Sequence, residues 1–398
     1  MLRCFVCVIL LLAGCLWAQS KEQAKAPATE PAPQSAQNED FRPIISRFPL
    51  QPDSVVTLDQ FDGRVPSQTK CDSDGNVYGG FAAGPASSIT RISADKNQPV
   101  TFSLSAVPDL AAPNAPSPVL SEFAVGTDGS VYFLILIRKQ DSNSGGASGS
   151  SRRMDPSNFE YRVVSFNSDG KYHSQFKLDQ GLAPNRIAVF SSGDLMLAGS
   201  EPDPEDEDTR IPFAGVFDSS GRFMKEIEMP RDLRSPDGPQ SQPAAGGWNR
   251  RGSFAVRGNA QGANDGNVYL LPNAAGAPVY VLSPGGEIVR TIKLESSANE
   301  RLGMSVAAGR LISWSQHVDN RRPQRLTSPP PSGQAASPPA VGADDSLFRI
   351  FNLQSGELAA EYTASPDLGT FACYSSGEFT FLRLDQAHHL QVVTASPH

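Results

Sequence analysis

The chain has little positive charge and few long apolar runs, and each shortage removes a class of partner. Lysine and arginine together number 34, against 42 aspartate and glutamate residues, so the net charge is −8. There is no basic stripe of the kind that binding to nucleic acid requires, and we do not expect that partner. Beyond the N-terminal segment no run of residues approaches the apolar length of a transmembrane helix. We therefore expect contact with a membrane only through a lipid anchor.

Common catalytic motifs are missing as well. No Gly-x-Ser-x-Gly phrase marks a hydrolase nucleophile. The five histidines have no metal-ligand spacing, and His388 and His389 are adjacent, so on a strand they would point to opposite faces. The carboxylate block at 201–208 is typical of a solvated loop. Asp72–Asn76 resembles the start of a Ca²⁺ loop but lacks the distal glutamate. We expect no cofactor and no metal, Ca²⁺ being the one ion that this phrase suggests.

The first residues have the pattern of an export signal. Arg3 precedes an apolar stretch that is too short to span a bilayer. Two forms are open: an ordinary signal peptide over residues 1–18, or a lipoprotein signal in which the phrase Leu12–Cys15 resembles the bacterial lipobox and Cys15 is lipidated. Residues 19–45, rich in Pro, Ala and Gln, predict a disordered linker. We expect an exported protein of the bacterial periplasm, the outer membrane as a lipoprotein, or the cell exterior.

A short phrase recurs along residues 46–398, in which a turn containing glycine leads into a strand-like run. It reads Asp-Ser-Asp-Gly-Asn-Val-Tyr at 72–78, Thr-Asp-Gly-Ser-Val-Tyr at 127–132 and Asn-Asp-Gly-Asn-Val-Tyr at 264–269. Glycine and aspartate supply the positive φ and the local hydrogen bonds of hairpin turns, and the alternating runs between them fit half-buried antiparallel strands. Repetition of this kind predicts a fold built from similar units.

Four strands in each unit, about six units and no convincing helix predict an all-β fold, a six-bladed β-propeller. The blades are expected at approximately 65–104, 120–178, 185–229, 250–294, 303–363 and 369–396. The last blade is one strand short, whereas the strand-like run at 53–58 has no partner. We predict that this N-terminal strand completes the last blade and closes the ring. A β-sandwich and a solenoid are the alternatives, but a solenoid would not need a spare strand at one end and a missing one at the other.

The repeated phrase, followed by Val-x-x-Phe-x-x-x-Gly, resembles the blades of NHL-type and TolB-like six-bladed propellers over residues 50–396. The resemblance implies the fold. It implies no single activity, because that superfamily includes hydrolases, lyases, lactonases, receptors and scaffolds.

The long insertions are predicted to lie on one face of the ring, which we call the looped face. They are the second turns and crossovers at 106–121, 141–158, 201–212, 230–251 and 317–345. Loops carry binding functions disproportionately, so we expect a protein, peptide or glycan partner on this face. An aromatic residue flanked by arginines is a common anchor, and the crossover at 230–251 contains Trp248, Arg250 and Arg251. We expect the chain itself to be a monomer.

Polar residues are predicted to meet at the mouth of the central channel on the looped face. Seven residues before the turn glycine, the innermost strands place Gln68, Glu122, Arg186 and Thr370, with Asn185 beside Arg186. Such a group would bind a small solute, or it would simply line a wet channel. We expect a non-catalytic binding module. The alternatives are a metal-assisted hydrolase or lactonase centred on Glu122, Asn185 and Arg186, and a structural envelope protein without a small ligand.

Two cysteines occupy equivalent positions on the first and last blades. Cys71 and Cys373 each lie four residues before the turn glycine of an innermost strand. If Cys15 is removed or acylated, they are the only cysteines of the domain in an oxidising compartment. A disulfide between them would staple the closed ring. Two buried free thiols are the alternative, because such positions can exceed the roughly 7 Å between Cα atoms that a disulfide allows.

Overall fold

The computed structural model describes residues 47–62, 65–81, 87–93, 99–112, 115, 117–139, 159–179, 181–228, 259–272, 278–294, 300–317 and 346–397. The predicted signal peptide with Cys15, the linker at 19–45, and Trp248, Arg250 and Arg251 lie outside these residues. The described regular structure is β-strand apart from two short 3₁₀ helices, η2 (Leu104–Ala106) and η4 (Pro366–Leu368). In this part of the chain no helix combines the length and apolar character needed to cross a bilayer.

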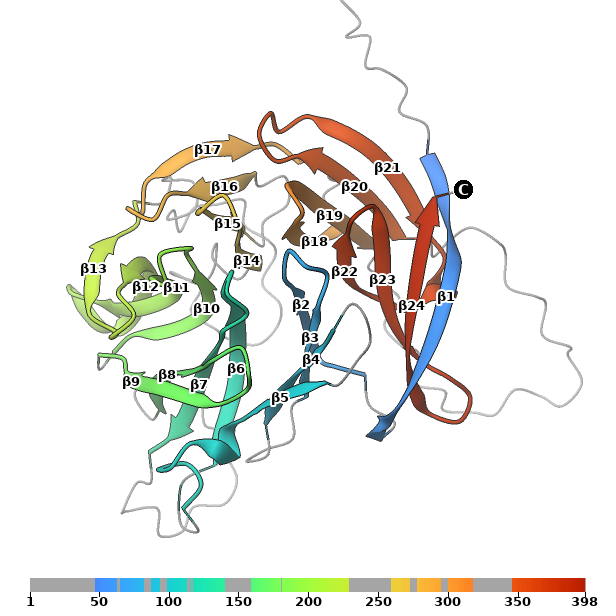
Figure 1. Cartoon of the computed structure of the whole chain (residues 1–398). Coiled ribbons are helices and arrows are strands. Elements are labelled where there is room, and N and C mark those ends of the chain that lie inside the picture. The colour runs from blue at the N-terminus through green and yellow to red at the C-terminus, as the bar shows by residue number, and fades with distance from the viewer. Residues whose placement is uncertain are drawn as a thin grey trace, which may run out of the picture. The chain divides into compact units, whose positions relative to one another are not determined.

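Four of the sheets are four-stranded antiparallel units (Figure 1). They contain β2 (Gln68–Cys71), β3 (Val77–Phe81), β4 (Ser88–Ile92) and β5 (Val100–Ser103); β6 (Pro118–Val125), β7 (Val131–Arg138), β8 (Phe159–Phe166) and β9 (Tyr172–Lys177); β10 (Ala183–Val189), β11 (Leu195–Asp203), β12 (Asp206–Phe217) and β13 (Phe223–Glu226); and β14 (Asn259–Gly262), β15 (Val268–Leu271), β16 (Val279–Leu282) and β17 (Ile288–Ile292). Within each sheet the strands follow chain order, which is the pattern of a propeller blade.

The remaining strands form one eight-stranded sheet rather than two separate ones. One half contains β18 (Glu300–Ala307), β19 (Arg310–His317), β20 (Ser346–Asn352) and β21 (Leu358–Ala364), and the other contains β22 (Thr370–Ser375), β23 (Glu378–Leu384), β24 (His389–Pro397) and β1 (Arg47–Asp62). The halves join where Arg47–Pro49 pairs in parallel with Glu361–Thr363. Arg47 Nε also donates a hydrogen bond to Glu361 Oε2 at 3.0 Å. This parallel junction was not predicted from the sequence.

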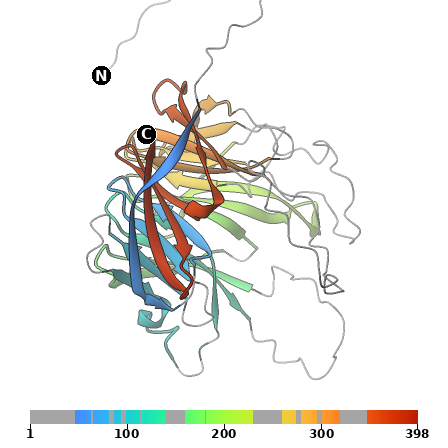
Figure 2. The ribbon, with the colours of Figure 1, turned by 90° about the vertical axis from the view of Figure 1, so that its right-hand side faces the viewer.

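The N-terminal strand closes the ring, as the sequence predicted. β1 pairs antiparallel with β24, with Val55 opposite Val393 and Leu58 opposite Leu390. Figures 1 and 2 both show these two strands side by side. The innermost strands β2, β6, β10, β14, β18 and β22 contact one another in that order, and β22 contacts β2. The described fold is therefore an all-β propeller of four-stranded blades.

The apolar core lies between neighbouring sheets. Because both faces of a blade are covered, the middle strands β15 and β16 are buried at every position and read as continuous apolar runs. Between β2–β5 and β6–β9 the core is aromatic, with Phe102, Phe123 and Phe133 fully buried. Between β2–β5 and the β22–β24 strands, Ile92 packs with Leu382 and Val392, so the junction of the first and last strands is an apolar interface like the others.

The repeated Asp-Gly-Asn phrase forms a self-contained hairpin turn. Asp72 Oδ1 accepts the backbone N–H groups of Asp74 and Asn76, each at 3.0 Å, and Asp72 Oδ2 accepts the Tyr78 hydroxyl at 3.0 Å. Gly75 has a φ of +83°, a conformation that favours glycine. The acceptor positions of the Asp72 carboxylate are thus occupied by donors from the same turn.

The looser copies of the phrase form shorter turns. Ala307 pairs with Arg310 and Ser375 pairs with Glu378, which leaves two residues in each loop. In both loops the two residues have positive φ, at Ala308 and Gly309 and at Ser376 and Gly377. A two-residue hairpin loop of this kind needs no capping aspartate, which explains why the aspartate is missing here.

Candidate functional site

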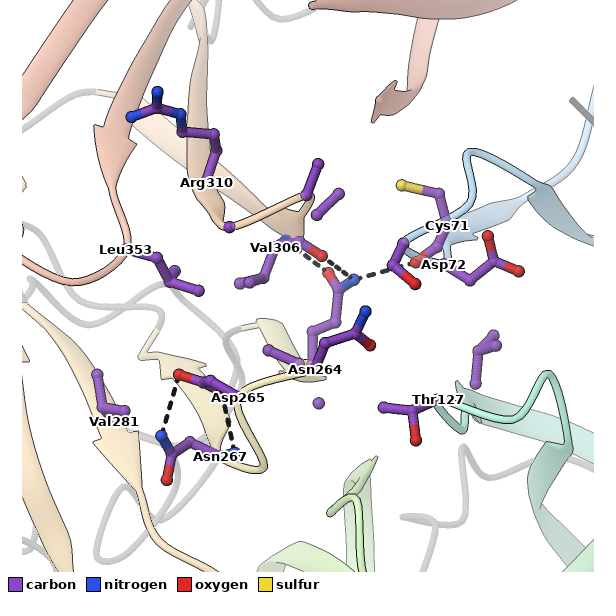
Figure 3. Close-up of a pocket in the computed structure, with 18 of the residues that line it drawn as sticks. Cys71, Asp72, Thr127, Asn264, Asp265, Asn267, Val281, Val306, Arg310 and Leu353 are labelled. Carbon is purple, nitrogen blue, oxygen red and sulfur yellow. Dashed lines mark hydrogen bonds between the residues drawn. The ribbon is translucent and has the colours of Figure 1, made fainter. Parts of the chain in front are cut away.

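A cavity of about 710 Å³ opens at the end of the channel where the first turns of the sheets lie, and we call it the turn-face cavity. Its walls include the turns after β2, β6, β14 and β18. Figure 3 shows Thr127, Asn264 and Arg310 around this space, each from a different sheet. It lies on the face opposite to the looped face, on which the sequence placed the binding site.

The turn-face cavity is elongated along a radius of the propeller. From Asn264 beside the channel, its lining continues to Val281 on β16 and Val289 on the outer strand β17. The opposite wall comes from the β18–β21 half, through the turns that contain Arg310 and Leu353. The cavity is therefore a groove between two neighbouring blades that begins at the central axis.

Both carboxylates of the groove are held by the turns that carry them. Asp265 accepts two bonds from Asn267, each at 3.0 Å (Figure 3). It also accepts a bond from the Tyr269 hydroxyl at 2.7 Å. Asp72 is held in the same way by its own turn. Burial raises the pKa of both Tyr78 and Tyr269; the charge of Asp72 adds to it at Tyr78, and the hydrogen bond to Asp265 and its charge add to it at Tyr269, so both phenols keep the proton that they donate.

Other polar groups of the groove remain available. Thr127 and Asn264 are exposed and Arg310 is half-buried, and within the described residues their side chains make no hydrogen bond or ion pair. The guanidinium of Arg290, in contrast, donates to the backbone carbonyls of Leu353 and Gln354. The groove thus presents a hydroxyl, an amide and a guanidinium beside the apolar side chains of Val281 and Val289.

Gln261 separates the turn-face cavity from the rest of the channel. Its Nε2 donates to the Cys71 carbonyl at 3.1 Å and the Val306 carbonyl at 2.9 Å, while its Oε1 accepts the Val306 N–H at 3.1 Å. Lys70 Nζ reaches across the channel to the Ala260 carbonyl at 3.3 Å. Strands β2, β14 and β18 are therefore linked through the central axis, and Lys70, Ala260 and Gln261 line the spaces on both sides of the link.

On the other side of Gln261 lies a smaller space of about 210 Å³, which we call the channel cavity. Gln68 and Glu122, both predicted at the channel mouth, line it together with Lys70. Glu122 is bound by two cations, since its Oε1 lies 3.3 Å from Lys70 Nζ and its Oε2 lies 3.3 Å from an Arg186 guanidinium nitrogen. Lys70 was not predicted from the sequence. Its position two residues after Gln68 on the same strand, hence on the same face, was the available signal.

Two of the predicted polar side chains donate hydrogen bonds to backbone carbonyls at bulges. Both β6 and β10 change register just before the predicted residue, at Ser121 and Asn185 respectively. A bulge of this kind leaves one residue outside the ladder. Gln68 Nε2 donates to the Ser121 carbonyl at 3.0 Å, and Arg186 donates to the Asn185 carbonyl. The buried oxygens Gln68 Oε1 and Asn185 Oδ1 have no hydrogen-bond partner in the described structure.

The five predicted residues are only partly brought together. Glu122 and Arg186 pair directly and Gln68 shares the channel cavity with Glu122, whereas Asn185 is outside its lining. Thr370 begins β22, is exposed and lines neither cavity. Within the described residues no three His, Cys, Asp or Glu side chains gather in a way that would hold a metal ion.

The structure joins Cys71 and Cys373 in a disulfide, with 5.4 Å between their Cα atoms. Both residues are buried, Cys71 on β2 and Cys373 on β22. The bond lies in the apolar interface between the first and last groups of strands.

No protein-family model matches the sequence, and no curated protein is significantly similar to it. Among solved structures the chain resembles a protein of unknown function from Bacteroides caccae, with a TM-score of 0.39, 12% identity and coverage of 81% of this chain and 90% of that chain. It also resembles the Pan2 WD40 domain of Neurospora crassa, with a TM-score of 0.40, 10% identity and coverage of 89% and 97%. A third is the β-propeller domain of the Trilobed protease from Pyrococcus furiosus, with a TM-score of 0.34, 10% identity and coverage of 80% and 79%. We draw no function from likenesses at these scores.

Proposed function

We propose that the chain is an exported, non-catalytic, six-bladed propeller related to the NHL-type and TolB-like group, which binds a segment of a partner protein. Six blades result when the two halves of the eight-stranded sheet are counted separately. This count is supported because each half has four strands and only Arg47–Pro49 of β1 joins them. The N-terminal signal pattern supports export.

The turn-face cavity is the binding site in this proposal, and its size and shape carry the argument. Its volume of about 710 Å³ lies within the range of ligand sites. The groove runs from the axis to the outer strand β17, a path that suits an extended peptide better than a compact solute. None of the described residues that line it is aromatic, so it lacks the flat surface on which a sugar ring stacks. A peptide is therefore favoured over a glycan.

Binding on the looped face and a hydrolase centre both have less support than binding in the turn-face cavity. Of the long insertions, 201–212 is not the predicted loop but an extension of the β11–β12 hairpin, and 141–158 and 230–251 lie outside the described residues, whereas the opposite face carries a formed groove. A metal at Glu122 would have to displace Lys70 and Arg186 from the two carboxylate oxygens. Arginine supplies no metal ligand, so the predicted group of Glu122, Asn185 and Arg186 does not have the donor set of a catalytic metal site.

The test is a selection of peptides from a random display library, followed by affinity measurements with fluorescence polarisation. The Asn264→Trp variant fills the groove at an exposed turn residue, and we expect it to weaken the selected peptides at least about tenfold. The matched control is Asn167→Trp, which changes an exposed turn residue outside the groove lining.

Two results would contradict the proposal. One is equal peptide affinity in the wild type and Asn264→Trp. The other is binding that survives Asn264→Trp but disappears when residues 232–250 are deleted, which would return the site to the looped face.

A further inference from the structure

The channel cavity is a second space with its own chemistry, separated from the groove by the hydrogen-bonded side chain of Gln261. Its volume of about 210 Å³ corresponds to about seven liquid waters. Strands β2, β6, β14, β18, β19 and β22 supply its walls, and the indole of Trp314 is part of them. It is too small for a peptide and large enough for a small solute.

Lys70 places a positive charge at this cavity. Lys70 and Glu122 are the charged side chains among the described residues that line it, and Arg186 pairs with Glu122 from outside the lining. Two cations thus share one carboxylate. The Lys70 ammonium has three donors, of which one reaches the Ala260 carbonyl and one reaches Glu122 Oε1. The ammonium also lies 5.6 Å from the centroid of the Phe123 ring. No hydrogen-bond acceptor among the described residues takes its third donor, so this site attracts a group that is both an acceptor and an anion.

The cavity also contains an acceptor that lacks a donor. Gln68 Nε2 is bound to the Ser121 carbonyl, which fixes the amide with Oε1 as its other end. Gln68 Oε1 is buried and has no hydrogen-bond partner. Leaving a buried acceptor unpaired is unfavourable, because the group has given up its hydrogen bonds to water. A hydroxyl group would satisfy it, whereas a bare carboxylate would not.

We propose that the channel cavity binds a small hydroxylated carboxylate, whose carboxylate accepts from Lys70 and whose hydroxyl donates to Gln68 Oε1. The two protein groups lie two residues apart on one face of β2, a separation of about 7 Å along the strand. A chain of several hydroxylated carbons that ends in a carboxylate spans this distance. The site is distinct from the peptide groove because it lies beyond Gln261, and the two spaces share Lys70, Ala260 and Gln261 in their linings.

Isothermal titration calorimetry of the purified full chain tests the proposal with three matched probes. D-galactonate has both groups, galactitol lacks the charge and hexanoate lacks the hydroxyls. We expect saturable binding of galactonate at one site per chain, at least about tenfold tighter than either of the other two. Gln68→Met should remove the preference for galactonate over hexanoate, and Lys70→Met the preference over galactitol. Lys177→Met, which changes a lysine on the outer strand β9, should leave both preferences unchanged.

A second readout covers the case in which Lys70→Met does not fold, because Lys70 also links β2 to β14. Trp314 lines the cavity, and Trp248→Phe leaves it as the only tryptophan beyond the export signal. Galactonate should change the indole emission of this variant in proportion to saturation. The proposal is overturned if galactonate gives no saturable heat, if the three probes bind alike, or if bound galactonate leaves the Trp314 emission unchanged.

Discussion

Removing the Cys71–Cys373 disulfide should lower the free energy of unfolding by about 2–5 kcal/mol. The bond joins residues 302 positions apart, so it constrains nearly the whole unfolded domain. The chain-entropy relation gives about 5–6 kcal/mol for a loop of that length, and native disulfides usually contribute somewhat less. Both cysteines are buried in the interface between the first and last groups of strands. We therefore expect the bond to stabilise the closed ring chiefly by limiting the unfolded state.

Guanidinium unfolding of the wild type and of the Cys71→Ala/Cys373→Ala variant measures this difference, with and without dithiothreitol. Alanine avoids placing a new hydroxyl in an apolar interface. Reductant should lower the wild-type midpoint toward that of the double variant and should leave the double variant unchanged. The reasoning is refuted if the non-reduced wild type contains two titratable thiols, or if full reduction does not move its midpoint.

Three smaller changes test other parts of the structure. Glu361→Gln should destabilise the junction of β1 and β21: although burial by itself raises the pKa of Glu361, bonds from Arg47 and Arg349 lower it below its usual 4.5. A carboxylate whose pKa is lower in the folded state stabilises the fold above the pKa of the unfolded state, and this stability is lost as the pH falls. The difference in free energy of unfolding between wild type and variant, measured in urea, should therefore shrink from about pH 7 to about pH 3. A difference that grew over this range would contradict the account. Asp72→Ala should lower the free energy of unfolding by about 2 kcal/mol in thermal or urea unfolding, because it leaves the turn donors and the buried Tyr78 hydroxyl unpaired. The control Asp74→Ala, at an exposed position of the same turn, should lower it little. Equal effects of the two changes would argue against the turn network. Gln261→Leu should lower the free energy of unfolding by about 1–3 kcal/mol in the same measurement, because it breaks the hydrogen bonds across the channel. An unchanged unfolding midpoint would show that this link does not stabilise the fold.

The strand pattern could be predicted from the sequence because it is local. The turn after each innermost strand carries its own glycine with positive φ and, in the stronger copies, an aspartate that binds the turn, as at Asp72 and Gly75. Counting strands between turns also predicted the pairing of β1 with β24, confirmed by Val55 opposite Val393. The parallel junction at Arg47–Pro49 was not predictable, because it depends on where the chain approaches the ring before joining it.

The candidate sites were harder to predict, because they depend on contacts between sheets. Counting back from the turn glycine predicted Glu122 at the channel, and Glu122 lines the channel cavity. Bulges at Ser121 and Asn185 shift the register, and the carbonyls of these two residues accept hydrogen bonds from predicted polar side chains. The turn-face cavity has no sequence signature, because residues from several blades form it only after the ring closes. The Gln261 link joins strands that are far apart in the chain and carries no local pattern.

Hydrogen–deuterium exchange of the protein with a saturating selected peptide tests the central claim, that the face of tight turns binds the partner. The proposed groove predicts slower exchange in the turns at 263–267 and 308–310 and on the outer strand β17. Slower exchange confined to the opposite face, at 201–212 and 230–251, would contradict it.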